Sequence, residues 1–407
     1  MADREYDIVV WGASGFTGRL VAEYLTRRSK DLPNLRWAMA GRNHTKLEQI
    51  RSDLNADDID ILIADSHDTD SLTTLVQRAR VIISTVGPYA LYGSELVKAC
   101  AAHGTDYCDL AGEVQWIREM INVADEPARE SGARIVHCCG FDSVPFDMGV
   151  WVAQQNMQQA HGVFSKTVTG LMRRMKGSFS GGTFASMINM MEEASGSPSL
   201  RKALTNVGML LPEPSRYISR PACESRVTWS VEGDTWTAPF VMTPINSRIV
   251  QRTNALLGSP WGEDFSYEEA VATGPGISGR TRAMAMLAGT GGFMLAAALK
   301  TTRKLLQRFL PEPGEGPDKL ARESGYYRAE MIAHHPTKSD ADIRVNVEGD
   351  MDPGYGSTSK ILAECALCLA LDDLKTPGGS WTPASAMGAA LQTRLETHAG
   401  LRFTVKD

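Results

Sequence analysis

The chain has 407 residues, of which 43% are apolar and 22% charged, and these proportions predict two or three globular domains and exclude a disordered protein. The net charge is −6, so we expect no nucleic-acid partner, because no overall positive field would collect phosphate. Seven irregularly spaced cysteines favour reduced thiols over a disulfide framework. Since the first residues also lack the pattern of a signal peptide, we expect a cytoplasmic protein.

Short apolar runs alternate with amphipathic stretches along the first 150 residues. The apolar runs predict strands at residues 6–11, 35–40, 59–64, 81–86, 107–110 and 134–138. The amphipathic stretches predict helices at residues 17–29, 46–54, 71–78, 94–103 and 114–131. Regular alternation of this kind predicts an α/β domain in which helices cover a parallel sheet.

The pattern changes after Gly149, where strand-like runs follow one another as hairpins. Strands are predicted at residues 166–175, 226–231, 235–242, 326–334 and 342–348. Hairpins imply an antiparallel sheet, and hence a second domain of α+β type. Helical spacing returns at 357–374 and 382–397, and we expect these helices to pack back on the first domain. The predicted domains are therefore 1–145, 146–350 and 351–407.

The segment Met284–Leu299 (MAMLAGTGGFMLAAAL) is apolar throughout. Its 16 residues fall short of the roughly 20 that span a bilayer, and its glycines weaken a helix. Two interpretations stay open: a buried or interfacial helix pair, or a peripheral contact with a membrane surface. In the second, cations would meet the lipid headgroups. The flanking cations are Arg280, Arg282, Lys300, Arg303, Lys304 and Arg308.

The strongest motif is the loop between the first strand and the first helix. It consists of Gly12, Ala13, Ser14, Gly15, Phe16, Thr17 and Gly18. Its glycines permit a tight turn and a close approach of the backbone to a pyrophosphate, whose charge the helix N-terminus stabilises. Because the strand, the spacing and the helix agree, we predict a dinucleotide site here.

The ends of the second and third strands face the rest of the nucleotide. A protein that binds NAD would carry a carboxylate after the second strand, to bond the ribose 2′-hydroxyl. This chain has Arg42 and Asn43 there, followed by Lys46, and a guanidinium suits a 2′-phosphate. We therefore predict NADP as the cofactor. Asp65 and Ser66 follow the third strand as further cofactor contacts, although Asp65 would also serve as a helix N-cap.

The fourth strand ends at the edge of the sheet where ligands bind in doubly wound folds. Cofactor contacts are predicted there from Thr85, Val86, Gly87, Pro88 and Tyr89.

Four side chains at this edge are candidate catalytic groups, because a reductase needs a proton donor and a group that stabilises negative charge. They are Tyr89, Tyr92, Cys139 and Asp142. The alternative is a structural role: packing for the tyrosines, a core position for Cys139 and a helix cap for Asp142. The sequence holds no metal-binding motif, so we expect no metal.

Three blocks, GASGFTGRLVAEYL, VGPYALYGSELVKACAAHGTDYCDLAGE and HCCGFDSVPFDMG, together resemble saccharopine dehydrogenase-like oxidoreductases, and among these the trans-acting enoyl reductases. The resemblance implies a Rossmann-type, doubly wound parallel sheet that binds NADP, with an inserted α+β domain containing an antiparallel sheet. It also implies reduction of the C=C bond of an enoyl-acyl substrate, a polyketide or lipid that is free or bound to a carrier. We further expect a homodimer.

Two alternative functions stay open. One is reduction of an imine or ketone, as in saccharopine reductases, for which Arg173, Arg174 and Arg216 are candidate ligands of a dicarboxylate. The other is a nucleotide-bound protein without turnover that contacts lipid through Met284–Leu299.

Overall fold

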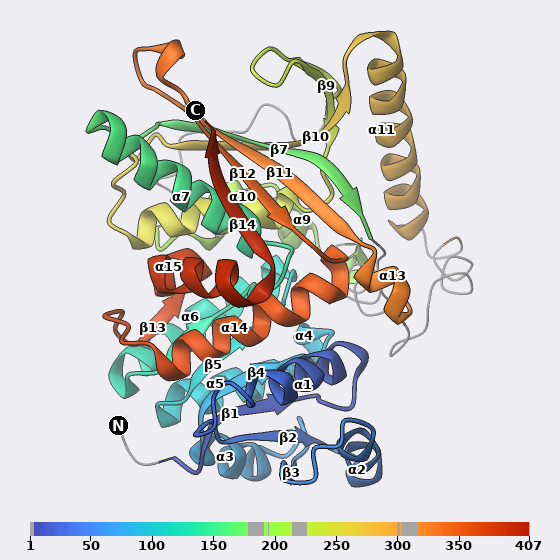
Figure 1. The fold of residues 1–407 in the computed structure, drawn as a ribbon, viewed down its shortest axis with the longest axis vertical. Helices are drawn as coiled ribbons and strands as arrows, with labels where there is room; N and C mark the ends of the chain where they lie inside the picture. The colour runs from blue at the N-terminus through green and yellow to red at the C-terminus, as the bar shows by residue number, and fades with distance from the viewer. Residues whose placement is uncertain are drawn as a thin grey trace.

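The computed structural model describes residues 4–177, 191–193, 195–213, 226–298, 302 and 316–406. These residues form two seven-stranded sheets, the first in the lower half and the second in the upper half of Figure 1.

The first sheet is parallel throughout, with the strand order β13-β6-β5-β4-β1-β2-β3. Its strands are β1 (Tyr6–Trp11), β2 (Trp37–Gly41), β3 (Asp60–Ile63), β4 (Ala79–Ser84), β5 (Asp106–Asp109), β6 (Arg134–Val136) and β13 (Gly379–Trp381). Because β1 pairs with β2 on one side and β4 on the other, the strand order reverses there, as in doubly wound sheets. The predicted Rossmann-type α/β fold is confirmed.

Helices cover both faces of this sheet, so alternate residues of β1 enter different cores. Ile8 and Val10 pack in one cluster, and Val9 and Trp11 in another. The helices of the first face are α1 (Phe16–Arg28), α2 (His44–Asp53) and α14 (Thr358–Leu371). Those of the second face are α3 (Thr69–Arg78), α5 (Ser94–His103) and α6 (Val114–Ser131).

A buried ionic network joins α14 to α1, although the two helices lie far apart in the sequence. The fully buried carboxylate of Glu364 accepts hydrogen bonds from Tyr24 Oη at 2.7 Å and Arg28 Nε at 2.9 Å. It also accepts one from Arg394 at 3.1 Å. A buried carboxylate needs such partners, so the network ties the C-terminal segment to the first sheet. The bounds of the three predicted domains stay a prediction.

The second sheet is mixed, with the order β14-β12-β11-β7-β10-β9-β8. Its strands are β7 (Thr167–Lys176), β8 (Thr228–Ser230), β9 (Thr235–Pro239), β10 (Ser266–Gly274), β11 (Tyr326–His334), β12 (Ile343–Gly349) and β14 (Leu401–Lys406). Only β7 and β10 pair in parallel; the other neighbours are antiparallel. Both predicted hairpins, β8–β9 and β11–β12, are present.

The sequence patterns missed the strands β10, β13 and β14 and two helices, α7 (Val144–His161) and α10 (Thr243–Leu256). The alternation of β10 is disguised because an inward position is Glu269, which accepts a hydrogen bond from Asn246 at 2.9 Å. Helix α10 lacks a polar face because even Arg252 and Gln251 are buried, where they donate to backbone carbonyl groups. Buried but satisfied polar residues therefore hide the hydrophobic period.

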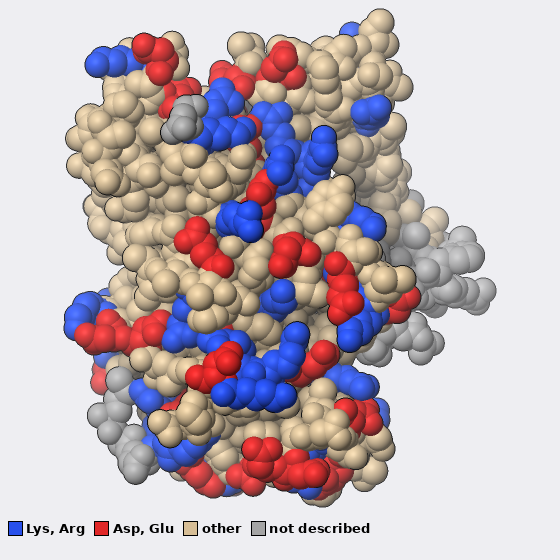
Figure 2. Space-filling model, viewed as in Figure 1, with Lys and Arg blue, Asp and Glu red and all other residues tan. Residues whose placement is uncertain are grey.

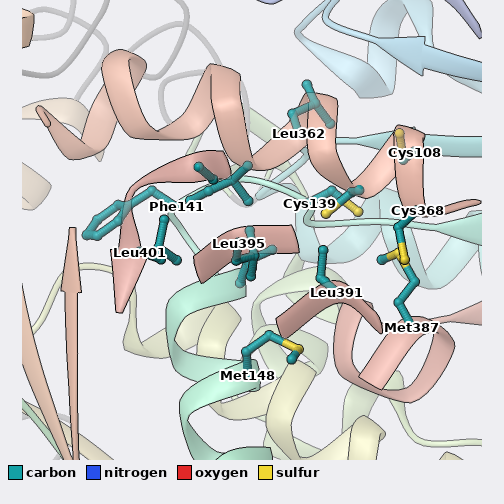
Figure 3. Close-up of a cluster of buried hydrophobic side chains, with 14 of the residues drawn as sticks. Cys108, Cys139, Phe141, Met148, Leu362, Cys368, Met387, Leu391, Leu395 and Leu401 are labelled. Atoms are coloured by element: carbon teal, nitrogen blue, oxygen red, sulfur yellow. The ribbon is translucent and has the colours of Figure 1, made fainter. Parts of the chain in front are cut away.

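The remaining elements connect the two sheets. Helix α7 packs against β11 and β12, α10 against β10, and α15 (Pro383–Arg394) against α7 and α14. The short elements are α4 (Tyr89–Tyr92), α9 (Pro198–Leu204), α13 (Lys319–Glu323), η1 (Val207–Leu210), η3 (Ser339–Ala341), η4 (Pro353–Ser357) and η5 (Leu395–Ala399). Figure 3 shows part of the core where α14 and α15 meet, with Cys139 among Cys108, Leu362, Cys368 and Leu391.

The apolar segment after Arg280 belongs to one helix, α11 (Gly276–Ala298), which packs against β9 and β10 and stands at the side of the molecule in Figure 1. The interpretation as a buried helix pair is wrong for the described residues, because Met284 is 53% and Leu295 64% exposed. The flanking cations at 300, 303, 304 and 308 lie outside the described residues. Within the described part of the chain, no helix is both long and apolar enough to cross a bilayer.

Candidate functional site

One cavity of about 1510 Å³ extends from the glycine loop to α11. It collects residues from both sheets, as expected for a ligand site at the carboxyl ends of parallel strands. The predicted residues that line it are Gly12, Ser14, Gly15, Phe16, Thr17, Arg42, Lys46, Ser66, Thr85, Val86, Gly87, Tyr89, Tyr92 and Asp142. The predicted residues that do not line it are Ala13, Gly18, Asn43, Asp65, Pro88 and Cys139.

The glycine loop has the close packing that a dinucleotide cradle requires. Gly12 adopts a left-handed φ of 86°, and an added Cβ would lie 2.5 Å from Val86 Cγ2. Gly18 lies outside the cavity, but a Cβ there would approach the Gly12 carbonyl oxygen to 2.1 Å. These glycines therefore let the turn, the neighbouring strand end and α1 meet directly, and the free backbone of the loop borders the cavity.

Two exposed cations stand on the cavity wall after β2. Arg42 and Lys46 both line the cavity. Asn43 has a different role from the predicted cofactor contact: its side chain accepts a hydrogen bond from the Lys46 backbone N–H at 3.0 Å and caps α2. Among the described residues, no carboxylate forms an ion pair with Arg42 or Lys46, and they lie beside the loop as a 2′-phosphate would require.

Asp65 and Ser66 lie next to each other in the turn after β3, but their side chains have different roles. Buried Ser66 lines the cavity, whereas Asp65 Oδ1 accepts a hydrogen bond from the His67 backbone N–H at 2.9 Å. The N-cap of α3 is Asp68, whose side chain accepts from the backbone N–H groups of residues 70 and 71. The alternative in which Asp65 caps the helix is therefore wrong.

The turn after β4 is fixed by a buried carboxylate. Glu113 accepts hydrogen bonds from the backbone N–H groups of Tyr89 at 2.8 Å and Ala90 at 2.9 Å. Gly87 joins Pro88 through a cis peptide bond. The tyrosine hydroxyl at 89 donates to the Ser84 carbonyl at 3.0 Å, so this side chain braces the turn from inside. Burial raises the pKa of Tyr89 well above its usual value.

Tyr92 lines the same cavity as Tyr89, from the other end of α4. In contrast to the buried Tyr89, it is only half-buried. Its ring meets that of His67 edge to face, with centroids 5.9 Å apart. Its hydroxyl forms no hydrogen bond with another described residue, so it is available to a ligand.

A rigid turn after β6 presents Asp142 to the cavity. Asp109 Oδ1 accepts hydrogen bonds from the backbone N–H groups of Ala111 at 3.0 Å and Cys138 at 3.1 Å, and its other oxygen lies 2.7 Å from His137 Nδ1. Removal from water raises the pKa of the Asp142 carboxyl from 3.8 to about 6. Near-neutral titration suits a group that exchanges protons with a substrate.

Cys139 lies in the core beside the cavity. Its side chain is fully buried in the cluster of Figure 3, and burial raises the pKa of the thiol well above its usual value. A thiol held protonated and away from the cavity wall is poorly suited to catalysis. Its position fits the alternative of a structural core residue.

The far end of the chain adds residues that local sequence patterns did not identify. Tyr355 and Thr358, from η4 and the start of α14, line the cavity. The Tyr355 ring meets Phe16 edge to face with centroids 4.9 Å apart, and Thr358 Oγ1 accepts a hydrogen bond from the Phe141 backbone N–H at 3.0 Å. They lie in the stretch RVNVEGDMDPGYGSTSK (344–360), whose hydrophobic pattern predicts a strand and the start of a helix but no ligand site.

The candidate ligands of a dicarboxylate are not gathered into a free cationic pocket. Arg173 lines the cavity, but its Nε donates to Glu330 at 2.8 Å and a terminal nitrogen donates to the Gly233 carbonyl at 2.9 Å. Arg174 is exposed on the wall, and Arg216 lies outside the described residues.

Comparison with known proteins gives consistent results. The family model described as saccharopine dehydrogenase NADP binding domain matches residues 8–136, and this confirms the prediction of NADP. A trans-acting enoyl reductase of Mycobacterium tuberculosis strain H37Rv is 36% identical over 97% of this chain and 96% of its own. Another chain of that strain, provisionally described in the same words, is 41% identical over 96% of both chains.

Solved structures show the same fold at low sequence identity. Saccharopine dehydrogenase (L-Glu forming) from Saccharomyces cerevisiae superposes with a TM-score of 0.53 at 12% identity, over 98% of this chain and 99% of its own. Homospermidine synthase from Legionella pneumophila, solved with NAD, gives a TM-score of 0.52 at 9% identity, over 100% and 92% of the two chains.

Proposed function

Because the chain belongs to the trans-acting enoyl reductases within the saccharopine dehydrogenase-like oxidoreductases, we propose that it uses NADPH to reduce the carbon–carbon double bond of an enoyl-acyl substrate. One observation carries this proposal. A single cavity joins the glycine loop and its cations to Tyr92, Asp142 and a long apolar end. Cofactor, proton-exchanging groups and acyl chain can therefore occupy one continuous space.

The glycine loop would hold the pyrophosphate with its backbone, and Arg42 with Lys46 would hold the 2′-phosphate. When bound, NADPH supplies the hydride. The remaining requirements belong to the protein, because reduction of an enoyl thioester develops negative charge on the thioester oxygen and needs a proton at the α-carbon.

Tyr92 and Asp142 are suited to these two tasks. The Tyr92 hydroxyl would donate a hydrogen bond to the thioester oxygen as its charge grows. Asp142, with a pKa of about 6, carries a proton more readily near neutral pH than an ordinary carboxyl does and would deliver it to the α-carbon. Tyr89 would position the turn through its bond to Ser84.

The test is consumption of NADPH by the purified chain with crotonyl and longer enoyl thioesters of N-acetylcysteamine, with the saturated product identified by mass spectrometry. We expect turnover, and we expect Tyr92→Phe to lower kcat by about 100-fold, the low end of the effect of a single charge-stabilising donor. Absence of turnover on every enoyl thioester, with NADPH bound, would refute the proposal. Turnover of an imine in the same assay would favour the alternative reduction.

Three expectations about partners and location belong to the same proposal. The relatives are named trans-acting, which supports an acyl substrate brought by a carrier. Six described cysteines are free thiols, which supports a reducing, cytoplasmic compartment. The homodimer stays a prediction that light scattering would test.

The outer face of α11 favours a peripheral lipid contact as a second candidate function. It carries Ile277, Met284 and Leu295, which are 86%, 53% and 64% exposed. In Figure 2 few charged side chains interrupt this surface of α11. Exposed apolar side chains grouped on a helix are typical of proteins that lie on a membrane.

A further inference from the structure

The apolar end of the cavity has a wall made by one face of α11. The residues that line it from this helix are Met286, Gly289, Thr290, Phe293 and Met294. Their spacing of three and four residues places them on a single stripe of the helix. Met284 and Leu295 lie on the opposite side of the helix and are exposed. The helix therefore presents one face to the cavity and another to its surroundings.

The opposite wall comes from the second sheet and the segment after β9. It consists of Met172 and Met175 from β7, Val271 and Ala272 from β10, and Pro239, Phe240, Val241 and Met242. Six of the chain's 18 methionines line the cavity as a whole. Methionine is unbranched and adapts its shape, so a methionine-rich wall accommodates a flexible alkyl chain better than a rigid ring system.

The volume leaves room for such a chain beside the cofactor. The cavity holds about 1510 Å³, whereas the pocket of a single small ligand measures about 300–1,000 Å³. Most of the residues that line the cavity between the second sheet and α11 are apolar, and Arg173, Arg174 and Thr290 are the polar residues of that part. The space can therefore hold a nucleotide at the glycine loop and an apolar group between the second sheet and α11.

We propose that the space between α11 and the second sheet binds the alkyl tail of the acyl substrate, and that Gly289 keeps this channel open. The inference rests on the proposed function, whose substrate it narrows to long acyl chains. Gly289 lines the cavity, and a Cβ added there meets no atom within 4 Å. Because it carries no side chain, the channel reaches the backbone of α11 at this point.

Gly291 provides a matched control. It lies in the same helix, is exposed as Gly289 is, and a Cβ there also meets nothing within 4 Å, but it does not line the cavity. At about 100° per residue, a step of two residues turns its side-chain direction by about 200° from that of Gly289. Phenylalanine at 289 therefore enters the channel, whereas phenylalanine at 291 points away from it.

The experiment first measures binding without turnover. Saturated N-acetylcysteamine thioesters of four, eight, twelve and sixteen carbons are titrated calorimetrically into the NADPH complex. In the unaltered chain we expect affinity to rise by up to about fourfold per methylene, the ratio that corresponds to burying one CH₂ group, until the channel is filled. In Gly289→Phe the ratio of sixteen-carbon to four-carbon affinity should fall at least tenfold, and Gly291→Phe should keep the unaltered ratio.

A second variant on the same face, Thr290→Phe, guards against misfolding of Gly289→Phe, and retained NADPH binding checks the fold of each. Equal affinity for all chain lengths, or an unaltered ratio in both Gly289→Phe and Thr290→Phe, would overturn the channel. If NADPH-dependent reduction occurs but does not depend on chain length, the proposal of the channel is refuted and the proposed reaction stands. Length-dependent binding without reduction of any enoyl thioester supports the channel and refutes the proposed reaction.

Discussion

Replacement of Asp142 by asparagine should make the chain more stable and less active. The carboxyl has a pKa of about 6 in the folded protein against 3.8 as the ordinary value. Between these pH values the folded state binds more protons than the unfolded state, so the free energy of unfolding falls as pH rises. At about 1.4 kcal/mol per pKa unit, ionisation of this carboxyl lowers the free energy of unfolding by about 3 kcal/mol at pH 7 and above.

Asparagine has nearly the same shape and carries no charge, so Asp142→Asn removes this pH-dependent cost. We expect the variant to exceed the unaltered chain in free energy of unfolding by up to about 3 kcal/mol at pH 7–8 and to match it near pH 4. Urea unfolding without cofactor, at intervals between pH 4 and 8, measures the difference. Asp147, whose pKa burial raises to about 7, is present in both proteins, and its contribution cancels.

Asp57→Asn is the matched control, because Asp57 is exposed and lies outside the cavity. Its effect should stay within about 0.5 kcal/mol at every pH. A stability difference for Asp142→Asn that does not change between pH 4 and 8 would refute the reasoning. So would a variant less stable than the unaltered chain at pH 7.

Three further predictions concern the cofactor, the core and the outer surface. Arg42→Ala should weaken NADPH binding by about 1.5–3 kcal/mol, roughly 10- to 150-fold, and NADH binding by less than twofold in calorimetry; equal losses would contradict the 2′-phosphate role. Glu364→Gln should lower the free energy of unfolding by about 1.5–3 kcal/mol, because Arg28 and Arg394 would lose a buried charged partner while keeping Asp31 and Asp372, and a loss below about 0.5 kcal/mol would contradict this. Met284→Glu should reduce flotation with phosphatidylglycerol vesicles, whereas equal flotation would argue against lipid contact through α11.

Short stretches of sequence predicted which residues gather at the glycine-loop end of the cavity. The turn at Gly12 and the cations at Arg42 and Lys46 each depend on a strand end and the few residues after it. Neighbours in the chain are necessarily neighbours in space there, and the alternation of strands with helices fixes which edge of the sheet they share.

Burial decided the roles that sequence left open. Asn43 caps α2 and Asp65 closes a turn, and in both the side-chain oxygen accepts a hydrogen bond from a nearby backbone N–H. Cys139 and Asp142 lie three residues apart on one strand end, yet the first is enclosed by the core of α14 and the second reaches the cavity. No local pattern distinguishes these two outcomes.

By itself the sequence determined the doubly wound sheet and the choice of NADP as cofactor, because these follow from the hydrophobic period and from motifs of adjacent residues. Only the tertiary structure brought Tyr355 and Thr358 beside Phe16 and Phe141 and made α11 one wall of the same cavity. Those contacts join segments hundreds of residues apart, and the packing that creates them also sets how far each side chain is removed from water.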